Sequence, residues 1–253
     1  MNQPLCDFDR LVAEAEAASF SGWDFSWLKG RWNESSPPWD YDQRVLAALP
    51  GVQSLLDLGT GGGEHLASLA PLAPDTWATE NYPPNMPIAR ARLEPLGVRV
   101  VTAVPDNALP FPDGRFDLVI NCHESFDAAE VCRILKPGGR YITQQVGGRD
   151  NLRLNELLQD DVAFEYYDHS LAEDVKQIAA AGLHIVEQME AFPETHFADI
   201  GAVVYYLRAI PWQIEDFTVE AYHDKLLALH RQILRDGGLT LASHRTYVEA
   251  IKP

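Results

Sequence analysis

Hydrophobic and polar positions alternate in short blocks between residues 51 and 148. Residues 52–58 form an apolar run that ends in a glycine-rich turn, a pattern that predicts a buried strand. Residues 64–72 follow with apolar positions at helical spacing, which predicts a helix. The alternation continues, and it predicts further strands at residues 76–79, 98–104, 116–121 and 140–146. Strands that alternate with helices imply crossover connections and a parallel sheet.

The predicted fold is therefore α/β: a Rossmann-like, doubly wound, mostly parallel sheet with helices on both faces. Residues 128–135 have the spacing of a helix, and residues 136–139 (KPGG) read as a turn before the fifth strand. Two more strands are predicted later, at residues 183–189 and within residues 239–251.

Two helices are predicted between these last two strands. Asp199 can cap the first, which Pro211 stops, and the second covers residues 219–234. The pattern thus predicts a domain over residues 46–253, with a helical insertion at about 195–237 before the last strand.

The first 45 residues form a helical and aromatic extension that contains four of the six tryptophans. Two interpretations of these side chains stay open. They could form a lid that covers a site and excludes water, or they could simply pack as core under a long loop.

Composition sets limits on the partners. The 253 residues are 46% hydrophobic and 23% charged, so a disordered or fibrous chain is excluded. Twenty basic against 37 acidic residues give a net charge of −17, which disfavours nucleic acid as a partner. No spacing of histidine, cysteine and acidic residues resembles a metal site, so no metal is predicted.

Cysteine usage and hydropathy indicate the compartment. Cys6, Cys122 and Cys132 are odd in number and form no CxxC pair, so we expect a reducing, cytoplasmic setting. Residues 1–10 lack the apolar core of a secretory signal. The longest apolar stretch, residues 200–207, is too short to span a bilayer, so we expect a soluble protein without a membrane segment.

The glycine-rich turn after the first strand allows a ligand to approach the backbone closely. The dinucleotide fingerprint is Gly-x-Gly-x-x-Gly; Gly59 and Gly61 match it, but Glu64 stands at the third position. A carboxylate there would repel a pyrophosphate, which weakens an NAD or FAD interpretation. The phosphate loop that ends in Gly-Lys-Ser/Thr does not occur.

Polar side chains follow the next predicted strands. Glu80 follows the second strand, where a carboxylate can accept hydrogen bonds from both ribose hydroxyls. Asp106 and Asn107 follow the third strand, where they could read the amino group of an adenine. Residues 121–124 (NCHE) follow the fourth strand, at the edge that faces the ligand in such sheets. For each position, ordinary turn chemistry is the structural alternative.

Three segments together resemble the class I S-adenosylmethionine-dependent methyltransferases. They are residues 55–64 (LLDLGTGGGE), 109–119 (LPFPDGRFDLV) and 133–139 (RILKPGG), in the order of that family. The resemblance covers roughly residues 40–146. It implies the seven-stranded methyltransferase type of sheet, S-adenosylmethionine as the cofactor and methyl transfer as the activity.

The resemblance also implies roles for individual residues. The glycine turn would line the methionine part of the cofactor, Glu80 would hold the ribose, and Asn121 would lie near the sulfonium. One departure concerns the adenine: Asp106 stands three positions before Leu109, where the family often has its acidic residue four positions before. The implied cofactor-binding residues are Asp57, Gly59, Thr60, Gly61, Glu80, Asn81, Asp106, Asn107 and Asn121.

The chemistry requires few catalytic groups. Transfer from a sulfonium is an in-line displacement, so positioning supplies much of the rate acceleration, and a base is needed only if the acceptor must lose a proton. His123 is the candidate base, with Glu124 and His169 as weaker candidates. A hydrogen-bonded structural histidine is the alternative interpretation of His123. The candidate residues for the acceptor pocket are Trp27, Trp39, Tyr206 and Trp212.

The predicted function is methyl transfer from S-adenosylmethionine to a small-molecule acceptor. Two alternatives remain: a methyltransferase that acts on RNA or protein, or a non-catalytic module that binds the cofactor. The fold does not choose the acceptor, and the sequence does not indicate an oligomeric state.

Overall fold

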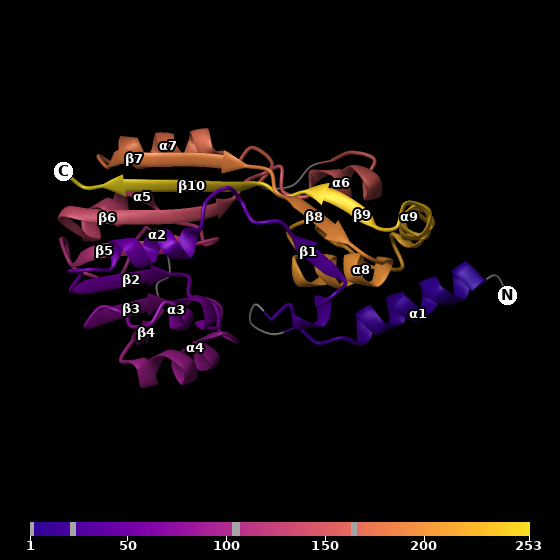
Figure 1. Ribbon diagram of the computed structural model, residues 1–253, viewed down its shortest axis with the longest axis horizontal. Helices are drawn as coiled ribbons and strands as arrows, with labels where there is room; N and C mark the ends of the chain where they lie inside the picture. Colours follow the sequence, from indigo (N-terminus) through magenta and orange to yellow (C-terminus); the bar gives the residue numbers. More distant parts are fainter. Residues whose placement is uncertain (1–2, 21–23, 103–106, 163–165) are drawn as a thin grey trace.

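A seven-stranded sheet forms the larger lobe of the computed structural model, which describes residues 3–20, 24–102, 107–162 and 166–253 (Figure 1). The strand order is β4-β3-β2-β5-β6-β10-β7. The first five strands in this order pair in parallel, and β10 is antiparallel to both neighbours. This confirms the predicted Rossmann-like, mostly parallel sheet. The strands are β2 (Ser54–Leu58), β3 (Asp75–Thr79), β4 (Arg99–Val101), β5 (Phe116–Cys122), β6 (Leu135–Val146), β7 (His184–Ala191) and β10 (Arg245–Ile251).

Helices bury both faces of this sheet. Leu55 of β2 packs on the face covered by α2 (Tyr41–Ala48), α3 (Glu64–Ser68) and α4 (Met86–Leu93). Leu56 packs on the opposite face, under α5 (Ala128–Ile134) and α7 (Leu171–Ala180). Successive side chains of a strand point to opposite faces. Because both faces are buried, the strands appear in the sequence as continuous apolar runs rather than as an alternating pattern.

A second, smaller lobe lies beside the large sheet, at the right of Figure 1. It contains a three-stranded antiparallel sheet in the order β1-β8-β9, which the sequence did not predict. Its core includes Phe8 and Leu28 from the N-terminal segment and Ile200 and Leu229 from the insertion. The elements are α1 (Gln3–Ala17), the 3-10 helix η1 (Ser26–Leu28), β1 (Trp32–Glu34), α6 (Leu152–Leu158), β8 (Glu194–Phe197), α8 (Ile200–Ala209), α9 (His223–Asp236) and β9 (Leu239–Ala242).

The N-terminal extension and the insertion therefore pack on each other. Arg31, just before β1, donates two hydrogen bonds to the carboxylate of Asp199, at 2.5 and 2.8 Å. The same carboxylate accepts a hydrogen bond from the N–H of Ala202, so Asp199 caps α8 as predicted. The predicted boundary at residue 45 falls inside α2, and Val45 packs on the large sheet.

The two lobes are joined by a bent antiparallel ribbon. β7 continues into β8, and β9 continues into β10, so the segment predicted to hold one last strand holds two. The bend lies at Phe192–Pro193 opposite Ser243–His244, where the N–H of Ser243 donates to the carbonyl of Pro193 at 2.7 Å. Residues 239–251 were predicted to contain a single strand, and the polar pair Ser243–His244 that separates the two observed strands was not interpreted as a break.

Three other boundaries differ from the prediction. The segment 136–139 lies within β6, because the N–H of Gly138 pairs with the carbonyl of Lys252 next to the strand end. The first crossover helix ends at Ser68, since Ala70 precedes Pro71 and is disfavoured in helical conformation. β4 is shorter than predicted, and residues 103–106, which include Asp106, lie outside the described residues.

Candidate functional site

The glycine turn connects β2 to α3 at the carboxyl edge of the sheet. Gly59, Gly61 and Gly63 all have positive φ angles, of 67°, 59° and 79°, which favour glycine. The N–H of Gly59 donates to Oγ1 of Thr79 at 3.0 Å, and the N–H of Thr60 donates to the carbonyl of Thr79 at 2.8 Å. The turn is therefore held against the end of β3.

Asp57 lies just below this turn, in β2, and is only 4% exposed. Burial raises the pKa of its carboxyl to about 6, and the neighbouring carboxylate of Glu80 acts in the same direction. Two acidic side chains thus lie close together at the carboxyl ends of β2 and β3. Such a pair would suit a ligand that brings positive charge or hydrogen-bond donors.

Glu80 lies directly after β3, at the predicted position, and its side chain is buried. Its Oε1 accepts a hydrogen bond from the N–H of Tyr82 at 2.6 Å, and its Oε2 faces Nδ2 of Asn85 at 3.5 Å. Oδ1 of Asn85 is buried and has no hydrogen-bond partner within the described residues. A buried acceptor without a donor is costly, so this corner fits the hydroxyl groups of a sugar. Asn81, next to Glu80, is half-buried.

Asn121 is the second-last residue of β5, and its side chain is fully buried. Its Oδ1 accepts hydrogen bonds from the N–H of Glu124 (3.1 Å) and from Nε2 of Gln145 (3.0 Å), and its Nδ2 donates to the carbonyl of Glu124 (3.0 Å). Its own carbonyl accepts a hydrogen bond from the hydroxyl of Tyr41 at 3.0 Å. The side chain therefore shapes the loop that follows β5.

His123 lies in this loop with a φ of 67°, a strained conformation for a residue with a side chain. Its Nε2 is 3.2 Å from Nε2 of Gln144, whose Oε1 accepts a hydrogen bond from the indole of Trp39 at 2.7 Å. An indole only donates, so the Gln144 amide group must donate to the imidazole. Desolvation by the neighbouring loops, together with the positive charge of Arg245, lowers the pKa of His123 and favours the neutral ring, while part of the side chain stays exposed to solvent.

Gln144 and Gln145, at the carboxyl end of β6, were missed by the sequence analysis. Each one fixes a residue of the loop after β5, and Gln145 also donates to the carbonyl of Glu124 at 3.0 Å. Their position at the end of a predicted strand was the available signal. Glutamine carries no charge, and neither residue lies within the three motif segments, so the sequence did not indicate a role for them in the site.

A buried ion cluster joins the lobes beside this loop. Arg245 pairs with Asp150 at 2.5 Å and with Glu34 at 2.7 Å, and the three side chains come from β10, the segment after β6 and β1. Two carboxylates share one guanidinium, and burial raises the pKa of Glu34. The cluster fixes the small lobe at the carboxyl edge of the sheet.

The four predicted acceptor residues are divided between the lobes, because Trp39 packs on the large sheet whereas Trp27 and Tyr206 belong to the core of the small lobe. Trp39 bonds Gln144 at the carboxyl edge, as described above. Trp27 stacks on Tyr205 at 4.7 Å in the small lobe, with the guanidinium of Arg31 4.1 Å above its ring. Tyr206 is buried, and its hydroxyl accepts a hydrogen bond from Asn151 at 3.1 Å. Trp212 is 44% exposed just beyond α8.

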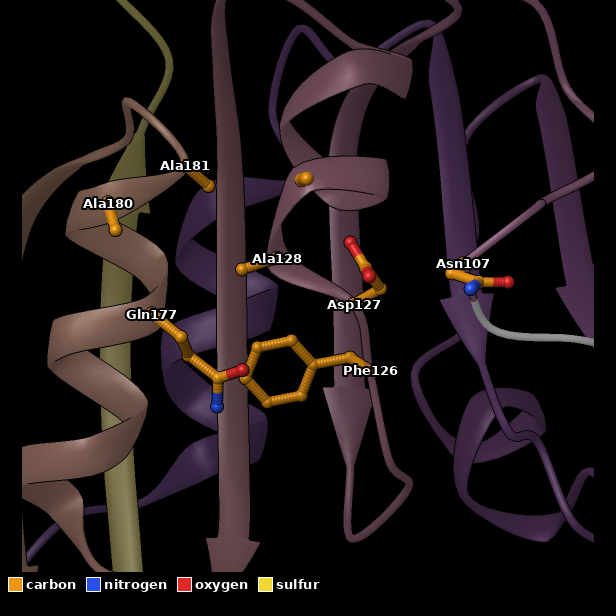
Figure 2. Close-up of a pocket in the computed structure, with 8 residues that line it drawn as sticks. Asn107, Phe126, Asp127, Ala128, Gln177, Ala180 and Ala181 are labelled. Atoms are coloured by element: carbon orange, nitrogen blue, oxygen red, sulfur yellow. The ribbon is translucent and has the colours of Figure 1, made fainter.

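A separate open cavity of about 600 Å³ lies between α5 and α7 (Figure 2). Among the predicted site residues within the described ranges, only Asn107 lines it; the glycine turn does not. In Figure 2 the ring of Phe126 and the amide of Gln177 approach each other at this cavity. The lining residues are Asn107, Phe126, Asp127, Ala128, Ala129, Gln177, Ala180 and Ala181.

The fold and the site together define a class of protein, the doubly wound domains that bind a nucleoside. In such domains the ligand lies at the carboxyl ends of the parallel strands, which are here β2, β3 and β5. A family model described as a methyltransferase domain matches residues 56–143. Residues 56–143 of the chain therefore match a methyltransferase domain, and the resemblance to the class I S-adenosylmethionine-dependent methyltransferases implies S-adenosylmethionine as the cofactor. The resemblance drawn from the three sequence segments is confirmed.

Two curated relatives are similar over the same region. A protein-L-isoaspartate O-methyltransferase of Cellvibrio japonicus is 30% identical over 135 residues, which cover 52% of this chain and 59% of that protein. A demethylmenaquinone methyltransferase of Thermus thermophilus is 36% identical over 107 residues, which cover 38% of this chain and 49% of that protein. The chain thus spans about half the length of the curated relatives it matches.

Solved structures show the same fold at low sequence identity. A Bacillus halodurans protein with a provisional methyltransferase assignment superposes with a TM-score of 0.61 at 19% identity, over 85% of this chain and 99% of that chain. The cyclase SpnF superposes with a TM-score of 0.53 at 17% identity, over 99% of this chain and 93% of that chain. Within the described residues, none of the helices is long and apolar enough to cross a membrane.

Proposed function

We propose that the protein is an enzyme that transfers a methyl group from S-adenosylmethionine to a small-molecule acceptor. The observation that carries this proposal is the corner formed by the glycine turn and Glu80. It combines a glycine turn with positive φ angles, a buried carboxylate and the Oδ1 of Asn85, which has no partner within the described residues. Hydroxyl groups of a ribose would satisfy both acceptors.

We assign the cofactor to residues around this corner. Gly59, Thr60 and Gly61 would line the methionine part, with Asp57 beneath them. Glu80 would hold the ribose, and Asn81 would lie against the adenine. Asp106 and Asn107 stay proposed adenine contacts, the first of them outside the described residues. Asn121 would act by holding the loop beside the sulfonium in shape.

The cofactor brings an already activated methyl group, so the chain has to bind, orient and exclude water. Holding donor and acceptor in line contributes up to about 7–11 kcal/mol to catalysis. His123 remains the proposed catalytic residue. Its Nε2 accepts a hydrogen bond from Gln144, so its Nδ1 carries the proton and can donate to an acceptor atom. A proton could be taken by Nε2 only after the Gln144 amide has moved away.

The small lobe would form the acceptor side of the site. The parallel strands direct their carboxyl ends toward this lobe (Figure 1), and the Arg245 cluster fixes it there. We therefore propose that residues 1–45 and the insertion at about 195–237 work as one cap. Trp39 would contact the acceptor from the sheet side, and Trp27, Tyr206 and Trp212 would set the shape of the cap.

A small, neutral or cationic acceptor suits the charge of the chain. The net charge of −17 opposes RNA. Relatives named for demethylmenaquinone and ubiquinone biosynthesis suggest quinone-type ring acceptors as the first class to test. The relative named for L-isoaspartate suggests a peptide carboxylate as the second.

Two experiments test the proposal in sequence. Calorimetry with S-adenosylmethionine and S-adenosylhomocysteine should show saturable binding to the full chain. An acceptor screen with methyl-labelled cofactor should then transfer the label to a ring hydroxyl or a ring carbon, whereas label on an isoaspartyl peptide would favour the protein alternative. Binding without transfer to any acceptor would favour the non-catalytic module, and label on RNA would favour the nucleic-acid alternative.

A further inference from the structure

His244 lies at the bend between the two lobes, where β9 ends and β10 begins (Figure 1), and it is fully buried. The ring of Phe192, on the other strand of the bend, stacks on the imidazole with the ring centres 4.5 Å apart. The guanidinium of Arg149 lies 4.5 Å from the centre of the Phe192 ring. The imidazole is thus the innermost layer of a three-layer stack at the joint between the lobes.

The segment after β6, residues 147–151, binds to the main chain of His244 and lies against its ring. The N–H of Gly147 donates to the carbonyl of His244 at 3.0 Å, and the N–H of His244 donates to Oδ1 of Asp150 at 2.8 Å. A Cβ atom added to Gly147 would be 2.1 Å from Nδ1 of His244. Because this segment leads from the large sheet into α6 of the small lobe, its contacts with His244 hold the lobes together.

The two nitrogens of the imidazole have different partners. Nδ1 accepts a hydrogen bond from the N–H of Arg149 at 3.2 Å, so Nδ1 carries no proton. Nε2 therefore carries the proton and donates to Oε1 of Glu190 at 2.8 Å. A second proton would have to sit on Nδ1, where it would face the N–H of Arg149 in the space that Gly147 closes.

Charged groups face His244 from three elements. Glu190 of β7 and Asp150 after β6 favour the protonated ring, Arg149 opposes it, and Arg245 of β10 donates to the carbonyl of His244 at 3.0 Å. Burial is the largest influence, and it lowers the pKa of His244 below its ordinary value of 6.5. The stability that the neutral ring contributes is therefore complete above pH 6.5, and it is lost as the pH falls through the lowered pKa of the folded state.

We propose that His244 is an acid-sensitive latch that holds the small lobe at the carboxyl edge of the large sheet. At neutral pH the unprotonated Nδ1 binds the segment 147–151, and protonation breaks this bond and releases the segment. The large sheet has hydrophobic cores of its own, so the joint opens before the sheet unfolds. The inference goes beyond the proposed function and does not use the cofactor, so either can fail without the other.

Hydrogen–deuterium exchange of the full chain tests the latch. The N–H groups of Gly147, Arg149 and Asn151 donate to residues 242–244. Peptides that carry them should lose about 10-fold in protection between pH 7.5 and pH 5, after correction for the intrinsic exchange rate. Peptides of β2 and β5 should stay protected. Equal loss in those peptides would show global unfolding and overturn the proposal, as would unchanged protection at the joint.

Two variants link the opening to the imidazole. His244→Asn keeps an acceptor near the position of Nδ1 but cannot take up a proton, so the joint should be protected equally at both pH values. Glu190→Gln keeps the acceptor for Nε2 and removes a charge that favours the protonated ring, so the opening should move to lower pH. This second variant changes a partly exposed side chain, and it decides the question if His244→Asn does not fold.

His184→Asn is the matched control. His184 begins β7 at the opposite end of the β7–β10 pair and is exposed, so this variant should open at the same pH as the wild type. A shift of the opening in this control would show a general effect of histidine charge and overturn the proposal. An opening that is unchanged in a folded His244→Asn protein, or that does not move in Glu190→Gln, would also overturn it.

Discussion

Trp39 and His123 bind opposite ends of one amide group. The indole N–H of Trp39 donates to Oε1 of Gln144 at 2.7 Å, and Nε2 of Gln144 lies 3.2 Å from Nε2 of His123. Because an indole has no acceptor, Trp39 fixes the orientation of the amide, and the amide fixes the tautomer of the histidine. A tryptophan 84 positions earlier in the chain thus decides which nitrogen of His123 carries the proton.

The first prediction concerns this tautomer. Nitrogen NMR of histidine-labelled protein should show His123 protonated on Nδ1 and unprotonated on Nε2. Trp39→Phe removes the donor, so the amide can turn and a mixture of the two tautomers is expected. Trp32→Phe is the control, because the indole nitrogen of Trp32 has no partner within the described residues. A single Nε2-protonated ring in the wild type would contradict the network.

The second prediction concerns the role of His123 in turnover. His123→Ala should slow methyl transfer by about 100-fold and leave the Kd for the cofactor unchanged. The surrounding loop and the positive charge of Arg245 lower the pKa of this ring from its ordinary value of 6.5, so any fall of kcat/KM caused by its protonation should appear only below pH 6.5. Unchanged turnover in the variant would remove His123 from the mechanism.

The third prediction concerns the ribose. Glu80→Gln replaces one acceptor oxygen with a donor, so affinity for S-adenosylhomocysteine should fall about 10- to 100-fold in calorimetry. Glu94→Gln, at an exposed position of the 3-10 helix η2 (Glu94–Leu96), serves as the control. Equal affinities in the two variants would show that Glu80 does not hold the ribose.

The fourth prediction concerns the pH dependence of stability. The pKa of Asp57 is raised to about 6 in the fold, mainly by burial, against an ordinary value of 3.8. Above pH 6 the folded state bears the cost of a buried charge, and this cost disappears as the pH falls through 6 toward 4. Asp57→Asn should therefore raise the free energy of unfolding at pH 8, by at most about 3 kcal/mol, and change it little at pH 4.

Urea denaturation of both proteins at the two pH values measures this difference. A variant that gains as much stability at pH 4 as at pH 8 would show that the charge of Asp57 is not the cause.

The fifth prediction concerns the N-terminal extension. Phe8 of α1 is 1% exposed in the core of the small lobe, so Phe8→Ala should destabilise the protein by about 3–5 kcal/mol. Glu14→Ala, on the exposed side of the same helix, should cost less than about 1 kcal/mol. Chemical denaturation measures both. A small effect of Phe8→Ala would favour a lid that moves independently of the lobe.

The sequence allowed the large sheet to be predicted because its strands are short apolar runs that alternate with helices, and because both faces are buried. The three-stranded sheet of the small lobe was not predictable in the same way. β1 comes from the N-terminal extension, whereas β8 and β9 flank the insertion, so no local pattern joins them. The break at Ser243–His244 divides residues 239–251 between two sheets.

The site was predictable where a residue follows a strand directly, as Gly59 and Glu80 do. Gln144 and Gln145 also end a strand, but their importance lies in partners on another loop. The contact between Glu124 and Gly59 depends on β5 lying beside β2 in the sheet, which only the assembled topology shows.

Calorimetry of the full chain with S-adenosylhomocysteine tests the central claim most directly. This compound is chemically stable and carries the ribose, adenine and amino acid groups assigned to Glu80 and the glycine turn. We predict a saturable heat of binding that Glu80→Gln weakens. Folded protein that gives no heat with either this compound or S-adenosylmethionine would contradict the assignment of the site.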